Sequence, residues 1–285
     1  MTSRILIQAP VDSSGDGRGE EHAPAALLAA GLLERIDVDA MVESDARIRD
    51  PSRDPATGVI GADQIRHAAE AIASDVRAAL EGGRMPLVVG GDCTLLLGVF
   101  LGVARRTGLW FVDGHADFFD GETSQTGEAA DMELAVLTGH GPPGLLPGND
   151  LLVAPAAVAL LGHRPDELGP DTATENARID PDIFALTSVQ IRELGPRSVA
   201  EDVASRSSGP AWLHVDLDVL DERVMPAVSY PQSLGLDWPE LVELVQPLAA
   251  APHLVGLSIG DLNPDLDPDG EHARRTVDAL AEILG

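Results

Sequence analysis

The sequence predicts an α/β protein with three layers, α/β/α, in which a mostly parallel sheet lies between helices. Short apolar runs of strand length alternate with longer segments of helical periodicity, as in strands joined by crossover helices. Acidic clusters follow three of the apolar runs, and open parallel sheets bind ligands at the carboxyl ends of their strands. No internal repeat or long linker divides the chain, so residues 1–285 are predicted to form a single domain.

The N-terminal half is predicted to contain three strands, at residues 5–8, 85–89 and 109–112. The helices predicted between them span residues 25–35, 61–80 and 95–105. Pro24 stands just before the first helix, where proline is favoured, and Gly82 and Gly83 end the second. Residues 45–57 are polar and contain two prolines, so we expect an irregular loop there.

The C-terminal half is predicted to contain strands at residues 183–189, 211–216 and 254–259. The predicted helices span residues 199–205, 241–248 and 271–284, and Asp237 with Glu240 has the spacing of a capping box before the second of them. Residues 151–161 are patterned too weakly to distinguish a strand from a helix. Residues 117–130 and 164–182 are predicted to be loops, the first of them on the rim of an active site.

The composition excludes several classes of partner. The chain has 47 acidic and 19 basic residues, all of the latter arginine, and a net charge of −28, which disfavours nucleic acid and anionic membranes. With one cysteine, Cys93, no intrachain disulfide can form. No apolar run approaches a membrane span, and the N-terminus lacks the hydrophobic region of a signal peptide. We therefore expect a cytoplasmic protein.

Two strand ends carry candidate metal ligands. The run that ends at residue 112 is followed by Asp113, His115 and Asp117, and Gly114 lets the backbone turn so that the three can converge. The run that ends at residue 215 is followed by Asp216 and Asp218. Carboxylates from two strand ends suit hard divalent cations, and two cations that share carboxylates form a water-activating site.

Several blocks of sequence, in order along most of the chain, resemble the arginase/agmatinase (ureohydrolase) superfamily. They are residues 17–24 followed by 30–34, Gly90-Gly91-Asp92-Cys93-Thr94, Asp113-Gly114-His115-Ala116-Asp117, residues 216–221 followed by Pro226, and Asp261-Leu262-Asn263-Pro264. The resemblance implies an arginase-like three-layer fold and a site with two divalent metal ions, usually manganese. It also implies a homo-oligomer, a trimer or a hexamer.

Carried over by position, the resemblance implies that Asp113 and Asp216 bridge the two metals. Asp117 and Cys93 would complete the coordination of one metal, and His115 and Asp218 would complete that of the other. A hydroxide held between the metals would attack the guanidinium carbon of a small-molecule substrate, and Asp218 would also orient that hydroxide. The resemblance therefore implies that the protein is a binuclear metal-dependent amidinohydrolase.

Cys93 departs from the family pattern, which has histidine at this position. A thiolate ligand would shift the preference of that position from manganese toward zinc, iron or cobalt. Alternatively, the thiol stays protonated and that metal is lost or only partly bound, leaving Cys93 a small buried residue. Both alternatives predict unequal metal sites, with the His115/Asp218 side the better filled.

A second departure is Ala130, which stands where the family has a histidine that is thought to shuttle protons. Alanine cannot transfer a proton, so Glu128 or Asp131 is a candidate replacement. The residues expected to contact the substrate are Phe119, Ser124, Thr126, Arg192, Tyr230 and Asp261.

Phe119 and Arg192 replace polar and acidic contacts that the family makes to an amino-acid head group, and Tyr230 replaces a small residue near the expected guanidinium position. We therefore predict hydrolysis of a C–N bond in a guanidino or N-substituted, for example N-hydroxy, guanidino compound rather than plain L-arginine. Two alternatives stay open. One is an inactive or non-hydrolytic relative that binds a small ligand, and the other is a hydrolase of another amidine or amide.

Overall fold

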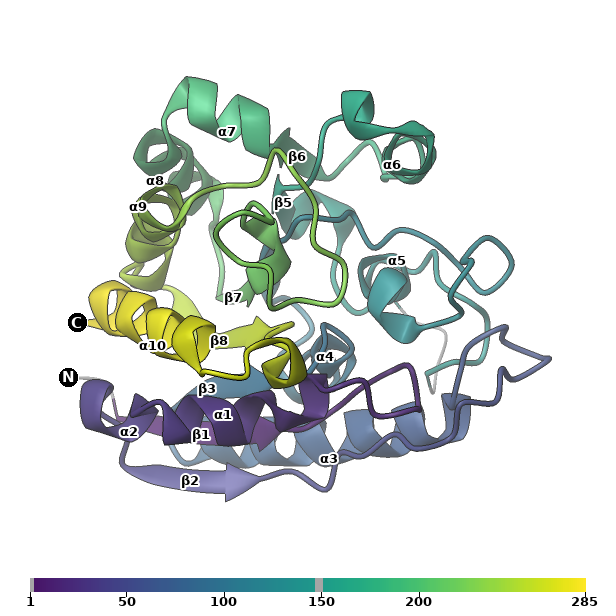
Figure 1. The fold of residues 1–285 in the computed structure, drawn as a ribbon, viewed down its shortest axis with the longest axis horizontal. Coiled ribbons are helices and arrows are strands. Elements are labelled where there is room, and N and C mark those ends of the chain that lie inside the picture. The colour runs from purple at the N-terminus through teal and green to yellow at the C-terminus, as the bar shows by residue number, and fades with distance from the viewer. Residues whose placement is uncertain (1–2, 147–150) are drawn as a thin grey trace.

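The computed structural model describes residues 3–146 and 151–285. Its centre is one eight-stranded sheet in the order β2-β1-β3-β8-β7-β4-β5-β6, in which every neighbouring pair is parallel. Helices cover both faces of this sheet (Figure 1). The predicted α/β class and the three-layer architecture are therefore confirmed.

The strands are short, as buried parallel strands commonly are. They are β1 Arg4–Ala9, β2 Ala40–Glu43, β3 Met85–Gly90, β4 Gly108–Val112, β5 Val158–Gly162, β6 Phe184–Thr187, β7 Ala211–Asp216 and β8 Leu254–Gly260. The α-helices are α1 Ala23–Ala29, α2 Leu32–Arg35, α3 Ala62–Glu81, α4 Leu95–Gly102, α5 Glu133–Leu137, α6 Pro170–Asn176, α7 Ser188–Leu194, α8 Pro196–Arg206, α9 Trp238–Ala249 and α10 Glu271–Leu284.

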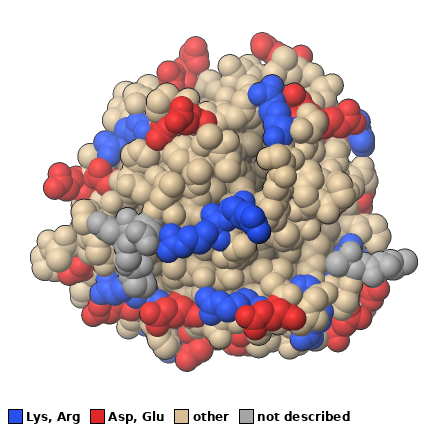
Figure 2. Space-filling view, turned by 180° about the vertical axis from the view of Figure 1, so that it is seen from behind, with Lys and Arg blue, Asp and Glu red and all other residues tan. Residues whose placement is uncertain are grey.

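Two apolar cores lie on opposite faces of the sheet because side chains alternate along each strand. On β1, Leu6 belongs to the core shared with α1, α8, α9 and α10, whereas Ile5 and Ile7 belong to the core shared with α3, α4 and α5. No helix formed by the described residues is both long and apolar enough to cross a membrane. Figure 2 shows a face on which most residues are neither acidic nor basic, with the acidic side chains mainly towards its edges.

Several element boundaries differ from the sequence prediction. The first predicted helix divides into α1 and α2 at Gly31, which has a left-handed backbone with φ of 93°. The helix predicted at residues 95–105 ends at Gly102 because Val103 is extended. Segment 151–161 contains a short 3-10 helix, Pro155–Ala157, followed by most of β5, and the predicted loop 164–182 contains α6. The missed elements β2, α5 and α7 are each seven residues or shorter, so they carry too little periodicity to be detected.

Gly91 joins β3 to the turn that carries Cys93, and it is packed directly against backbone. A Cβ atom at Gly91 would lie 1.6 Å from the carbonyl oxygen of Val11. We expect Gly91→Ala to cost about 1–3 kcal/mol of unfolding free energy or more, because backbone must move to relieve the overlap. In thermal unfolding this lowers Tm by roughly 2–4 °C for each kcal/mol.

Gly169→Ala is the matched control, since a Cβ there meets no heavy atom within 4 Å. It should unfold at the wild-type temperature. A Gly91→Ala protein as stable as Gly169→Ala would show that the turn adapts freely to a side chain.

Candidate metal centre

Four neighbouring strands bring the candidate ligands to one edge of the sheet. β3 leads into Cys93 and β4 into Asp113. β7 ends at Asp216, and β8 leads into Asp261. The strand order β3-β8-β7-β4 makes the carboxyl ends of these four strands adjacent, so residues far apart in sequence meet.

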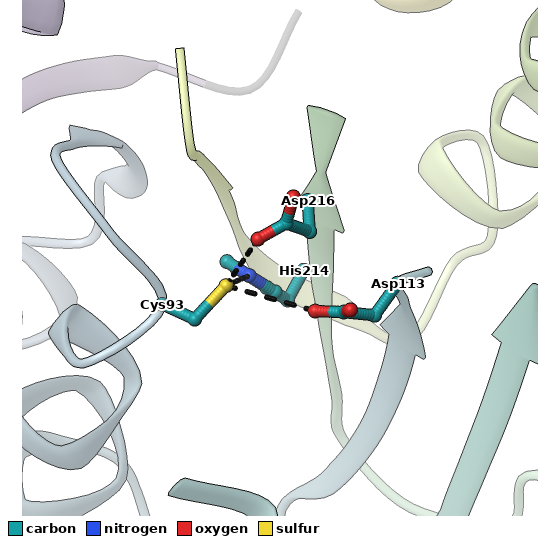
Figure 3. A group of neighbouring side chains, drawn as sticks. All are labelled: Cys93, Asp113, His214 and Asp216. Carbon is teal, nitrogen blue, oxygen red and sulfur yellow. Dashed lines mark hydrogen bonds between the residues drawn. The ribbon is translucent and has the colours of Figure 1, made fainter. Parts of the chain in front are cut away.

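The thiol of Cys93 lies at the centre of this group (Figure 3). Its Sγ atom is 3.6 Å from Oδ2 of Asp113, hydrogen-bonds to Oδ2 of Asp216 and lies 3.3 Å from Nε2 of His214. Carboxylates from β4 and β7 therefore reach one sulfur atom, in line with the expected convergence of Asp113 and Asp216.

A cavity of about 170 Å³ opens over these strand ends. It is lined by Arg18, Glu20, Asp92, Cys93, Asp113, His115, Asp117, Phe119, Thr126, Glu128, Ala130, Asp131, Glu175, Asp216, Asp218, Ser229, Tyr230 and Asp261. The structure thus brings together all six predicted metal ligands. It also brings both candidate proton donors and all but two of the predicted substrate contacts to the cavity.

Donor atoms of side chains that are buried, or partly buried in the case of His115, form overlapping sets within which all atoms lie within 4.8 Å of one another. The sets around the predicted ligands are Asp113 with His115 and Asp218, Asp216 with Asp218 and Asp261, Cys93 with Asp113, Asp117 and Glu133, and Cys93 with Asp113, His214 and Asp216. Oxygen, imidazole and thiol donors this close together suit divalent cations. Neither carboxylate oxygen of the buried Glu133 has a hydrogen-bond partner, which also fits a cation.

Burial raises the pKa of Asp113, Asp117 and Asp216 well above the usual range, and neighbouring acids raise it further. These carboxylates therefore repel one another strongly when no cation is present. A divalent cation reverses this effect, because it favours the ionised form of each acid. The electrostatics and the donor geometry agree on a cation site.

His115 and Asp218 are paired inside the cavity. Nδ1 of His115 lies 2.7 Å from Oδ2 of Asp218. Burial alone would raise the pKa of Asp218, but His115 and the guanidinium of Arg164 outweigh burial and lower this pKa to about 2. Asp218 is thus the acid of the group that stays ionised most readily.

The buried guanidinium of Arg164 fixes the backbone that carries Asp218. It donates to the carbonyl oxygens of Asp218 at 2.7 Å, Val219 at 3.2 Å and Leu220 at 3.0 Å. A side chain that holds three successive carbonyls positions the Asp218 carboxylate without touching the cavity.

The two candidate replacements for the missing histidine have different surroundings. Glu128 accepts a hydrogen bond from Nη2 of Arg18 at 2.5 Å and one from the hydroxyl of Tyr230 at 3.1 Å. Asp131 accepts hydrogen bonds from the hydroxyls of Ser124 at 2.6 Å and Thr126 at 2.7 Å, while its Oδ1 is buried without a partner. Burial raises the pKa of both acids. Glu128 is held in an ion pair, whereas Asp131 keeps one free oxygen.

The structure does not bring Arg192 to the cavity, which corrects the expectation that it contacts the substrate. Arg192 lies on α7, and its Nε is 2.6 Å from Oε1 of Glu240 on α9. The capping box of Thr187 and Gln190 starts α7, and Nη2 of Arg192 also donates to the carbonyl oxygen of Gly235 at 2.9 Å. Ser124 does not line the cavity either, but its hydroxyl donates a hydrogen bond to the carboxylate of Asp131.

Sequence reasoning missed seven polar residues of the site, which are Arg18, Glu20, Asp92, Glu133, Glu175, His214 and Ser229. Glu133 and Glu175 come from the undetected helices α5 and α6, so no local pattern marked them. His214 did carry a signal. It stands two residues before Asp216 on one strand, and such residues point to the same face.

The fold and the buried donor cluster define a metal-binding α/β/α hydrolase of the amidinohydrolase type, and comparison with known proteins identifies the family. A sequence model described as Arginase family matches residues 3–285. Arginase from Bacillus caldovelox is 29% identical, with 98% of this chain and 97% of the relative covered. Arginase from Staphylococcus aureus strain MRSA252 is 26% identical, with 94% and 92% covered.

The structure of Bacillus caldovelox arginase superposes with a TM-score of 0.86 at 28% identity, covering 100% of this chain and 99% of that one. The agmatine ureohydrolase of Thermoplasma volcanium shares the fold, with a TM-score of 0.71 at 19% identity over 99% of this chain and 89% of its own. The protein described here belongs to the arginase family.

Proposed function

We propose that the protein hydrolyses a C–N bond of a cationic guanidino or N-substituted guanidino compound other than L-arginine. The observation that carries this proposal is the charge of the cavity. Ten carboxylates line it, against only two basic side chains, Arg18 and His115. Such a site favours cations, both divalent metals and a guanidinium group.

When bound, two divalent cations supply Lewis acidity and lower the pKa of a bound water. The residues assigned to hold them are Cys93, Asp113, His115, Asp117, Asp216 and Asp218, and manganese is the metal that the family resemblance implies. The role of these side chains is to fix the donors before substrate arrives. Asp218, held by Arg164 and paired with His115, is assigned to accept a hydrogen bond at its carboxylate and so to orient the attacking water.

Proton delivery to the departing nitrogen is assigned to Asp131. Its carboxylate lines the cavity beside Ala130, and its free Oδ1 has no competing partner. Glu128 is the weaker candidate because its ion pair with Arg18 favours the ionised form, which cannot donate a proton.

Substrate selection is assigned to the groups at the mouth of the cavity. The ring of Phe119 lines the cavity and offers no hydrogen bond to an amino-acid head group, and the hydroxyl of Thr126 is already bound to Asp131. Tyr230 and Glu128 add a hydroxyl and a carboxylate, which gives a polar substituent such as an N-hydroxyl group partners. A cavity of about 170 Å³ restricts the substrate to a small molecule.

The test is a comparison of kcat/KM among L-arginine, N-hydroxy-L-arginine, agmatine and 4-guanidinobutyrate, with urea and hydroxyurea as the products measured. We expect one of the other compounds to exceed L-arginine by roughly 10–200-fold, the range that one or two lost contacts produce. L-arginine as the best substrate would overturn the proposed specificity. No product from any guanidino compound with metal-loaded protein would instead support the inactive, ligand-binding alternative.

A cytoplasmic location and a trimeric or hexameric assembly stay predictions. Light scattering of the purified protein would measure the assembly.

A further inference from the structure

We propose that His214 and Glu133 are additional metal ligands beside Cys93, each in one of the two donor sets that share Cys93 and Asp113, which makes this part of the centre a mixed sulfur, nitrogen and oxygen site. The proposal rests on the metal centre of the proposed function, but not on the identity of the substrate. It concerns two side chains that neither the D-x-H-x-D nor the D-x-D pattern contains.

The first argument is the geometry of His214 and Cys93. A tetrahedral ion with a sulfur ligand at about 2.3 Å and a nitrogen or oxygen ligand at about 2.0–2.1 Å holds those ligand atoms roughly 3.5–3.6 Å apart. Nε2 of His214 lies 3.3 Å from Sγ of Cys93, and Oδ2 of Asp113 lies 3.6 Å from the same sulfur (Figure 3). These separations match neighbouring ligands of one ion.

The second argument is the way in which His214 is held. Its side chain is fully buried and its ring stacks on Phe111, with the ring centroids 5.5 Å apart. Nδ1 lies 2.8 Å from Oγ of Ser258, which also accepts the indole N–H of Trp212 at 2.9 Å. Because this oxygen has two lone pairs, it can accept Nδ1–H as well and leave the Nε2 lone pair facing Cys93. Metal-binding histidines are oriented in this way by their second nitrogen.

The third argument comes from Glu133. Its side chain is fully buried, it shares a donor set with Cys93, Asp113 and Asp117, and both of its oxygens lack a hydrogen-bond partner. The neighbouring acid Asp117 interacts with Glu133, and this contact adds to burial in raising the pKa of Asp117, but neither Glu133 oxygen has a partner at hydrogen-bond geometry. A buried carboxylate with two unsatisfied oxygens is costly unless a cation binds there.

Together these side chains change the chemistry expected at the position. Cys93 alone would be a single soft donor among aspartates, which is a weak basis for metal selection. Cys93 with His214 is a thiolate and imidazole pair, the combination that selects zinc, iron(II) or cobalt(II) over manganese. Glu133 supplies a further oxygen ligand. It comes from α5, a different element from the strand end that carries the D-x-H-x-D pattern.

The experiment titrates metal-free, full-length protein with cobalt(II) or zinc alone and needs no substrate. Cobalt-loaded wild type should show a sulfur-to-cobalt charge-transfer band, and Cys93→Ser should lose it. His214→Gln and Glu133→Gln should each weaken cobalt and zinc binding at this position by at least about tenfold, with His214→Gln keeping the band. Ser258→Ala should weaken metal binding less than His214→Gln does. It removes only the hydrogen bond that orients the His214 ring and leaves the ring itself in place.

His163→Gln is the matched control, since His163 is also buried but lies outside the cavity, and it should bind cobalt like the wild type. Unchanged cobalt affinity in His214→Gln would overturn the assignment of His214, and unchanged affinity in Glu133→Gln would overturn that of Glu133. If a variant does not fold, X-ray absorption spectroscopy of the zinc-loaded wild type tests the proposal instead. A zinc coordination shell without sulfur would contradict it. Metal binding of the expected kind in a protein that turns over no guanidino compound would refute the proposed function alone.

Discussion

Replacing Asp216 by asparagine is expected to lower turnover by at least about 10³-fold and to reduce bound metal to less than one ion per chain. Asp216 belongs to two donor sets, one with Cys93 and one with Asp218 and Asp261, so its loss affects both metal positions. Metal catalysis is worth several kcal/mol, and each 1.36 kcal/mol is a factor of ten in rate. Steady-state kinetics on the best guanidino substrate and elemental analysis of the purified variant measure the two effects.

Asp221→Asn is the matched control for this substitution. Asp221 is also buried and lies on the same segment, but it pairs with Arg223 at 2.6 Å and does not line the cavity. It should keep its metal and most of its rate. If the Asp216→Asn protein held two metals, or retained more than about a tenth of the wild-type rate, Asp216 would not be a ligand shared by the two metals.

The convergence of the predicted ligands could be predicted from the sequence because their position follows from local rules. Asp113, His115 and Asp117 alternate directly after an apolar strand, and Asp216 and Asp218 do the same. Parallel strands end at one edge of the sheet, so two such clusters meet without any knowledge of the loops. Cys93 was found differently, through the resemblance of its glycine turn, since one cysteine carries no spacing pattern.

Glu133 and Glu175 could not be predicted, because they belong to short helices whose approach to the cavity depends on tertiary packing. α5 has five residues and α6 has seven, fewer than two helical turns each. Arg192 shows the opposite error. A loose alignment placed it near the substrate, but the short helix α7 was not predicted, and that helix carries Arg192 outward to Glu240.

Edge elements of the fold were hidden for a similar reason. In β2 the side chains alternate between partly buried and exposed, and the strand has one neighbour only, so its sequence lacks the apolar run that marks the central strands. The central strands β3, β4, β7 and β8 are buried on both faces, and all four were predicted.

Removing the metals with a chelator is expected to lower Tm by roughly 10–20 °C. A ligand present at 100 times its Kd adds about 2.7 kcal/mol of stability per site. Each kcal/mol corresponds to about 2–4 °C in a chain of this size. The physical cause is the cluster of Asp113, Asp117 and Asp216, whose burial is unfavourable in the ionised form unless cations neutralise it.

Differential scanning calorimetry with and without EDTA, followed by re-addition of manganese or zinc, measures this effect. Asp216→Asn provides the control, because a chain that has already lost its metals should respond little to the chelator. Re-addition should restore Tm in the wild type, and zinc should restore it more fully than manganese if the Cys93 position selects softer ions. A wild-type Tm that EDTA leaves unchanged, in protein shown by elemental analysis to have lost its metals, would mean that the acidic cluster is stable without cations, and the structural argument for the centre would fail.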